Sequence, residues 1–226
     1  MPADYSAPRA SPLRGRPPGV IRDSELARLL EHPAIWRGRS AARTEAVSTG
    51  FDTLDECLPG RGWPRSGLTE ILVPRFGVGE LSLLLPALAT LTRRPAARWC
   101  VWVTPPLDPF APALAAHGLL LEKILIARAG TSLWAFEQSL GSGACDVVMA
   151  WARRLRTREI RRLQLAAERG RTLGILFRSR SAARESSPAI LRMAVEPLPQ
   201  GARVTLLKSR GGRNGSIEIG HLPAGS

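Results

Sequence analysis

The stretch Glu70-Ile71-Leu72-Val73-Pro74-Arg75-Phe76-Gly77-Val78-Gly79-Glu80-Leu81 decides how the chain is interpreted. An apolar run ends at Val73, a turn with two glycines follows, and a second apolar segment begins at Leu81. This pattern predicts a strand, a glycine turn and a helix. In nucleotide-binding proteins the same layout directs backbone N–H groups at a helix N-terminus toward phosphate oxygens.

The residues that carry out phosphate chemistry are missing from this turn. A working phosphate loop follows its last glycine with Lys, which neutralises phosphate charge, and with Ser or Thr, which holds Mg²⁺. Glu80 and Leu81 occupy these positions. A carboxylate about 4 Å from a phosphate charge costs about 4 kcal/mol at an effective dielectric constant near 20. We therefore predict no ATP binding, no hydrolysis, no cofactor and no metal site, with Gly77 and Gly79 forming a plain strand-to-helix turn.

Strand and helix patterns alternate along the chain and then end in strands alone. Expected strands span 67–73, 98–104, 123–127, 146–151, 173–178, 189–197, 203–209 and 217–219. Expected helices span 51–58, 80–92, 111–117, 132–140 and 158–169, with Pro86 either bending the second helix or marking its true start. The order predicts an α/β fold with a central, mostly parallel sheet flanked by helices and a C-terminal antiparallel meander. Ligands of such sheets bind beyond the carboxyl ends of the parallel strands, where the glycine turn lies.

The chain divides into three expected segments. Residues 1–47 form a flexible N-terminal segment with one short helix over 25–30, residues 48–220 form the core, and residues 221–226 form a tail. No apolar run is long enough for a membrane helix, and the first residues lack the apolar block of a secretion signal. Three widely spaced cysteines fit buried thiols, so we expect a cytoplasmic protein, with association with the nucleoid as an option.

Positive charge is concentrated in the last third of the chain. The net charge is +13, of which residues 151–226 contribute +11, whereas residues 48–150 are nearly neutral. Such a distribution is typical of proteins that bind nucleic acids or acidic proteins. A genome rich in G and C is an alternative explanation, because every basic residue except Lys123 and Lys208 is arginine. That bias would not leave the middle third neutral.

A basic helix and its surroundings are the second candidate site. On a helix over 158–169, Ile160, Leu163 and Ala167 share one face, so the arginines of that helix point outward. We predict a positive rim over the carboxyl edge of the sheet that contacts DNA phosphates or an acidic protein. A solvated helix face is the alternative. The rim comprises Arg153, Arg154, Arg156, Arg158, Arg161, Arg162, Arg178, Arg180 and Arg184.

The ordered set Ser48-Thr49-Gly50, Leu54-Asp55, 62–67 and Glu70-Ile71 resembles the core of the RecA recombinase. Residues 74–81 are similar to the ImuA family, RecA-like proteins that are sometimes grouped with the division inhibitor SulA. The resemblance covers about residues 48–220. It implies a RecA-like P-loop fold with a vestigial nucleotide loop. That loop comprises Pro74, Gly77, Gly79, Glu80, Leu81 and Trp151, where Trp151 replaces the Mg²⁺-linked carboxylate.

The resemblance also implies a function. ImuA proteins accompany translesion DNA synthesis after SOS induction. The implied partners are an inactive Y-family polymerase homologue (ImuB-like) and an error-prone DNA polymerase III alpha-type subunit, with DNA as a further option. Neither a membrane nor a small-molecule substrate is implied. Two alternatives stay open: a SulA-like inhibitor that binds the division protein FtsZ, and a divergent DNA-dependent ATPase, against which the missing catalytic residues argue.

Overall fold

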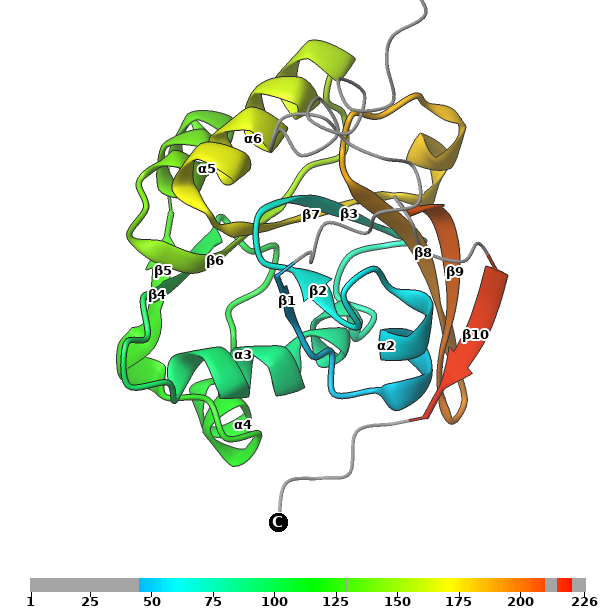
Figure 1. The fold of residues 1–226 in the computed structure, drawn as a ribbon, viewed down its shortest axis with the longest axis horizontal. Helices are drawn as coiled ribbons and strands as arrows, with labels where there is room; N and C mark the ends of the chain where they lie inside the picture. The colour runs from blue at the N-terminus through cyan, green and yellow to red at the C-terminus, as the bar shows by residue number, and fades with distance from the viewer. Residues whose placement is uncertain (1–44, 129, 210–214, 221–226) are drawn as a thin grey trace, which may run out of the picture. The chain divides into compact units, whose positions relative to one another are not determined.

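The computed structural model describes residues 45–128, 130–209 and 215–220 (Figure 1). The helix expected over 25–30 and the tail 221–226 lie outside the described residues. Among the helices that the structure describes, none is long and apolar enough to cross a membrane.

An eight-stranded mixed sheet forms the centre of the fold (Figure 1). Its spatial order is β10-β9-β8-β3-β7-β6-β4-β5. The strands β3, β4, β5, β6, β7 and β8 pair in parallel, whereas β8, β9 and β10 pair antiparallel at the C-terminal end. Their bounds are β3 Gly67–Val73, β4 Trp99–Val103, β5 Ile124–Ala127, β6 Cys145–Trp151, β7 Leu173–Ser179, β8 Leu191–Leu198, β9 Gly201–Ser209 and β10 Gly215–Ile219.

Helices cover both faces of this sheet, α5 and α6 on one side and α2, α3 and α4 on the other (Figure 1). Successive strand residues therefore enter different cores: Val148 packs under α5 and α6, whereas Met149 joins the core of α2 and α3. The helices are α2 Asp52–Cys57, α3 Leu85–Thr92, α4 Ala111–Ala116, α5 Ser132–Gly141 and α6 Thr157–Gly170, with 3-10 helices η1 Glu80–Leu83, η2 Leu121–Lys123 and η3 Arg180–Arg184.

Two features of the chain bear on the boundaries expected from the sequence. Pro86 marks the start of α3, and the residues before it form η1 instead of an α-helix. This agrees with one of the two roles expected for the proline. The short strand β1 (Ala46–Val47) pairs antiparallel with β2 (Trp63–Pro64). Residues 46 and 47 of the segment expected to be flexible thus pair with a strand of the core.

A buried ion cluster lies in the middle of the sheet. Glu70 on β3 is fully buried and accepts hydrogen bonds from Arg178 on β7 at 3.1 Å and from Arg192 on β8 at 2.5 Å. Arg192 also donates to the backbone oxygens of Ala182 and Glu185, and Arg178 pairs with the Glu185 carboxylate at 2.8 Å. One carboxylate therefore holds three neighbouring strands and fixes η3 beyond the end of β7.

This arrangement predicts a large effect of removing the buried charge. The variant Glu70→Gln leaves the buried Arg192 without a carboxylate partner and Arg178 with Glu185 alone, and we expect the free energy of unfolding to fall by about 3–5 kcal/mol. Urea denaturation followed by tryptophan fluorescence measures the change. The control is Glu218→Gln, which breaks an exposed pair with Arg203 and should cost about 0–1 kcal/mol. Equal losses in the two variants would contradict the structural role of Glu70.

Candidate functional site

The glycine turn lies between the end of β3 and the start of η1. Gly77 and Gly79 have φ angles of 81° and 94°, in the left-handed region that favours glycine. A Cβ atom added at Gly77 would also lie 2.9 Å from the Leu107 side chain. Both glycines are therefore required by the geometry of the turn, which bends the chain back over the carboxyl edge of the sheet.

The carboxylate of Glu80 fills the concave side of this turn. Its oxygens accept hydrogen bonds from the Gly77 backbone N–H at 2.9 and 3.1 Å and from the Val78 N–H at 2.9 Å. Only 4% of the Glu80 residue surface is exposed. Backbone N–H groups of such turns form an anion-binding concavity. Here the anion is a side chain of the protein itself.

Trp151 completes the enclosure of Glu80 from the end of β6. Its indole Nε1–H donates to Glu80 Oε1 at 3.3 Å, and its ring stacks on Phe177 with centroids 4.9 Å apart. Trp151, at the position of the Mg²⁺-linked carboxylate of a phosphate-loop protein, is therefore a hydrogen-bond donor to Glu80. The Leu81 side chain packs against the core and offers no ligand atom.

These contacts change the interpretation of Glu80 obtained from the sequence. The sequence predicts a carboxylate that repels an incoming phosphate. In the structure the carboxylate accepts hydrogen bonds from the N–H groups to which a phosphate would bind. Across the described ranges, no group of three or more His, Cys, Asp or Glu side chains is arranged to hold a metal ion.

The structure divides the nine predicted rim arginines into three groups. Arg178 is fully buried in the Glu70 cluster, so its assignment to the surface rim is wrong. Arg162 pairs with Glu137, and Arg180 pairs with Glu196 at 3.0 Å. The others are exposed, and in the part of the chain that the structure describes they form no ion pair: Arg153, Arg154, Arg156, Arg158, Arg161 and Arg184.

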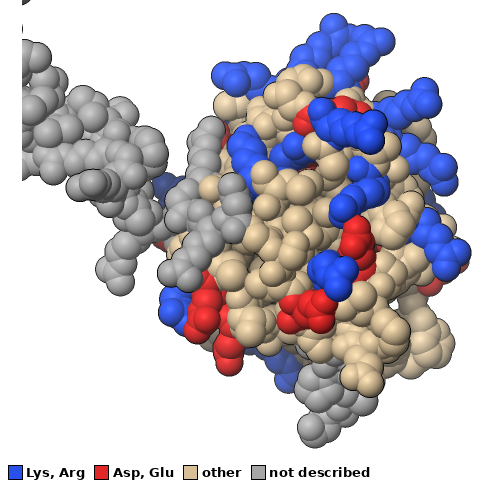
Figure 2. Space-filling model, turned by 90° about the vertical axis from the view of Figure 1, so that its right-hand side faces the viewer, with Lys and Arg blue, Asp and Glu red and all other residues tan. Residues whose placement is uncertain are grey.

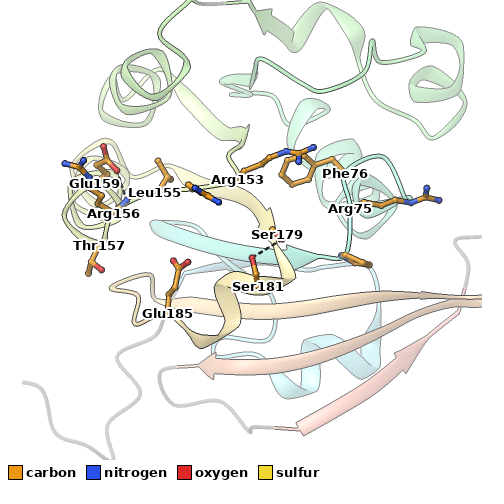
Figure 3. Close-up of a pocket in the computed structure, with 12 residues that line it drawn as sticks. Arg75, Phe76, Arg153, Leu155, Arg156, Thr157, Glu159, Ser179, Ser181 and Glu185 are labelled. Atoms are coloured by element: carbon orange, nitrogen blue, oxygen red, sulfur yellow. Dashed lines mark hydrogen bonds between the residues drawn. The ribbon is translucent and has the colours of Figure 1, made fainter.

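Three of these exposed arginines line a pocket of about 1060 Å³, which we call the basic pocket (Figure 3). Arg153, Arg154 and Arg156 contribute from the segment between β6 and α6. Figure 3 shows Arg75 and Phe76 on one side and Arg156 on the other, with Ser179 and Ser181 between them. All these segments follow carboxyl ends of parallel strands, which is why they meet.

Sequence reasoning missed part of this pocket. The predicted rim lacks Arg75, Ser179 and Ser181. Arg75 lies two residues after the expected strand 67–73, and Ser179 directly follows the expected strand 173–178. Since carboxyl ends of neighbouring parallel strands share one edge, the strand assignments alone contained a signal for Arg75 and Ser179. Basic side chains also gather along the upper and right-hand margins of the face drawn in Figure 2.

An apolar surface lies on the other side of the glycine turn. Leu107 and Phe110, in the loop after β4, are 66% and 70% exposed. They line a small pocket of about 220 Å³ together with Gly77, Leu81 and Trp151. Exposed large apolar side chains close together are typical of protein-binding surfaces.

Comparisons with known proteins show to which family the chain belongs. The model of the family described as "Cell division inhibitor SulA" matches residues 75–174. Cell division inhibitor SulA of Edwardsiella piscicida is 36% identical over 119 residues, which is 50% of this chain and 69% of that protein. The chain belongs to the SulA family. Protein ImuA of Caulobacter vibrioides is 27% identical over 213 residues, covering 80% of this chain and 87% of that protein.

A structural comparison adds the crystal structure of SulA from Pseudomonas aeruginosa. It matches with a TM-score of 0.42 and 27% sequence identity, covering 49% of this chain and 97% of that chain.

The expectation of a RecA-like P-loop fold is wrong. The family match is to SulA and begins at Arg75 inside the glycine turn. The turn leads into a single 3-10 segment instead of an α-helix, and its N–H groups are bound by Glu80. In sequence, a phosphate-binding loop and a turn closed by its own carboxylate look alike. The sequence does not show where the Glu80 carboxylate points.

The variant Glu80→Ala should destabilise the turn. It leaves the N–H groups of Gly77 and Val78 and the Trp151 indole without their acceptor, and we expect a loss of about 1–3 kcal/mol in the free energy of unfolding. Denaturation by urea measures it, with Ser82→Ala, an exposed neighbour on η1, as the control. If the Glu80→Ala variant is as stable as the Ser82→Ala control, the role given to the carboxylate is contradicted.

Proposed function

We propose that the chain is a non-catalytic accessory protein of an SOS-induced translesion DNA synthesis complex. The observation that carries this proposal is the Glu80 carboxylate in the glycine turn. Phosphoryl transfer depends on positively charged groups and metal ions around the phosphates. A turn whose N–H groups are bound by an internal carboxylate provides neither, so a role in binding other macromolecules is favoured over an ATPase.

The extent of similarity favours an ImuA-like role. The ImuA match covers 80% of this chain, whereas the SulA match of Edwardsiella piscicida covers 50%. The positive charge of the last third of the chain is also consistent with a protein that acts near DNA. We propose a cytoplasmic location, with association with the nucleoid as an option.

The proposed partners are an inactive Y-family polymerase homologue (ImuB-like) and an error-prone DNA polymerase III alpha-type subunit. The exposed pair Leu107 and Phe110 offers the apolar anchors that protein interfaces use at their centre. We propose this surface as the site where one polymerase subunit binds.

A second candidate is a SulA-like inhibitor of cell division that binds FtsZ. It is favoured by the 36% identity to a SulA protein and by the family match over 75–174. The two candidates differ in their partner, which makes them separable by experiment.

Affinity purification of the tagged full-length chain from cells with damaged DNA distinguishes them. We expect polymerase subunits to co-purify, and we expect the variant Phe110→Asp to reduce their recovery at least several-fold. The matched control is Leu165→Asp, an exposed apolar residue on α6. Recovery of FtsZ without polymerase subunits would support the division inhibitor and contradict the proposed function.

Nucleotide binding provides an independent check. We expect calorimetry with MgATP to show no binding at millimolar nucleotide, and we expect no phosphate release. The double variant Glu80→Lys/Leu81→Thr should also lack turnover, because Trp151 still stands where the metal-linked carboxylate would be needed. Metal-dependent turnover by the natural chain, lost when Glu80 is replaced, would contradict a non-catalytic role.

A further inference from the structure

We propose that the basic pocket binds the phosphate backbone of single-stranded DNA. The inference deepens the proposed function and rests on it for the choice of DNA as the nucleic acid. The site itself follows from the residues that meet at the carboxyl edge of β3, β6 and β7.

The acidic groups that line the basic pocket have partners within the protein. The Glu159 carboxylate accepts the Arg156 backbone N–H at 2.6 Å, at the start of α6. Glu185 pairs with the buried Arg178 at 2.8 Å. Within the described ranges, Arg153, Arg154 and Arg156 have no such carboxylate partner. Their three guanidinium groups are therefore free to bind an external anion.

Neutral donors complete the arrangement. Ser181 Oγ–H donates to Ser179 Oγ at 3.1 Å in the middle of the basic pocket (Figure 3). The Ser179 hydroxyl hydrogen is left to donate to an oxygen in the pocket. Thr157, the first residue of the 14-residue helix α6, lines the same space. Arginine and serine side chains are the usual partners of phosphate oxygens in protein–DNA complexes.

The composition of the pocket favours nucleic acid over an acidic protein segment. Protein interfaces have an apolar centre. The exposed apolar pair Leu107 and Phe110 lies in another pocket, and the apolar lining of the basic pocket is limited to Pro74, Phe76 and Leu155. Three further exposed arginines, for which the described part of the chain offers no ion pair, follow in or near the same segments: Arg158, Arg161 and Arg184.

Phe76 and the concave form of the site favour a single strand. The Phe76 ring is half-buried and lines the pocket next to Arg75. Single-strand binding sites combine a positive groove for the backbone with an aromatic ring on which a base stacks. A duplex keeps its bases paired and inside, so it would leave this ring without a partner.

The test is fluorescence anisotropy with the full-length chain and labelled oligothymidine of about 20 nucleotides, longer than a typical single-strand site. With three phosphate contacts, affinity should fall about 20-fold between about 50 and about 200 mM salt. The variant Arg153→Gln/Arg154→Gln removes two contacts, so its affinity at the lower salt should be at least tenfold weaker. Its fall over the same salt range should shrink to about threefold.

A control variant of equal net charge distinguishes binding of DNA in the basic pocket from non-specific attraction of DNA to a positively charged protein. The variant Arg169→Gln/Arg171→Gln removes two exposed arginines at the opposite, amino-terminal side of β7. It should retain the affinity and the salt dependence of the natural chain. Equal losses in the two double variants would overturn the proposal.

Competitors decide between the classes of ligand. Unlabelled single strands should displace the probe more effectively than a duplex of the same sequence or poly-glutamate. Equal displacement by the duplex would overturn the single-strand assignment, and equal displacement by poly-glutamate would overturn DNA as the ligand. Because the Phe110 surface is unchanged in these variants, recovery of polymerase subunits reports separately on the proposed function.

Discussion

The carboxylate of Glu70 is the interaction on which the rest of the structure depends. It is buried in the centre of β3, between two strands that each supply an arginine. A single arginine would have sufficed to neutralise it, so the second charge must be balanced elsewhere. The Glu185 carboxylate balances it at Arg178, while the backbone oxygens of Ala182 and Glu185 accept hydrogen bonds from Arg192. The cluster thereby extends from the core to the segment that forms one wall of the basic pocket.

Glu80 is a second buried carboxylate with hydrogen-bond donors around it, at the end of the turn that follows β3. A turn that presents unpaired backbone N–H groups to a buried space needs an acceptor, because an unsatisfied buried donor is costly. In a nucleotide-binding protein the ligand supplies that acceptor. Here Glu80 supplies it permanently and Trp151 covers it from β6. The result is a turn whose N–H groups are satisfied without a ligand, between the surfaces on its two sides.

Those two surfaces differ in chemistry. The loop after β4 exposes Leu107 and Phe110, whereas the segment after β6 exposes arginines around a polar pocket. An apolar surface fits a protein partner, and a basic one fits the phosphates of a nucleic acid. An accessory protein that brings a polymerase subunit to DNA would need both surfaces, with a fixed distance between them. Residues of the glycine turn line both pockets and so lie between the two surfaces.

Much of the secondary structure was predictable from local pattern. The strand Gly67–Val73 agrees residue for residue with the expectation, and Pro86 marks a helix start because its ring excludes it from a helix interior. The pairing of Ala46–Val47 with β2 was missed, since a two-residue strand has no periodicity to detect.

The sequence by itself determined the order of strands and helices, the loss of the phosphate-loop lysine and hydroxyl, and the excess of arginine in the last third. The tertiary structure alone decided what the charged residues do. Arg178 and Arg153 look alike in sequence, yet one is buried against Glu70 and the other lines an open pocket. The direction of the Glu80 side chain likewise decides whether its carboxylate repels a bound phosphate or takes the place of one, and the structure shows the second. These outcomes depend on which residues distant in the chain become neighbours, and local pattern does not contain that information.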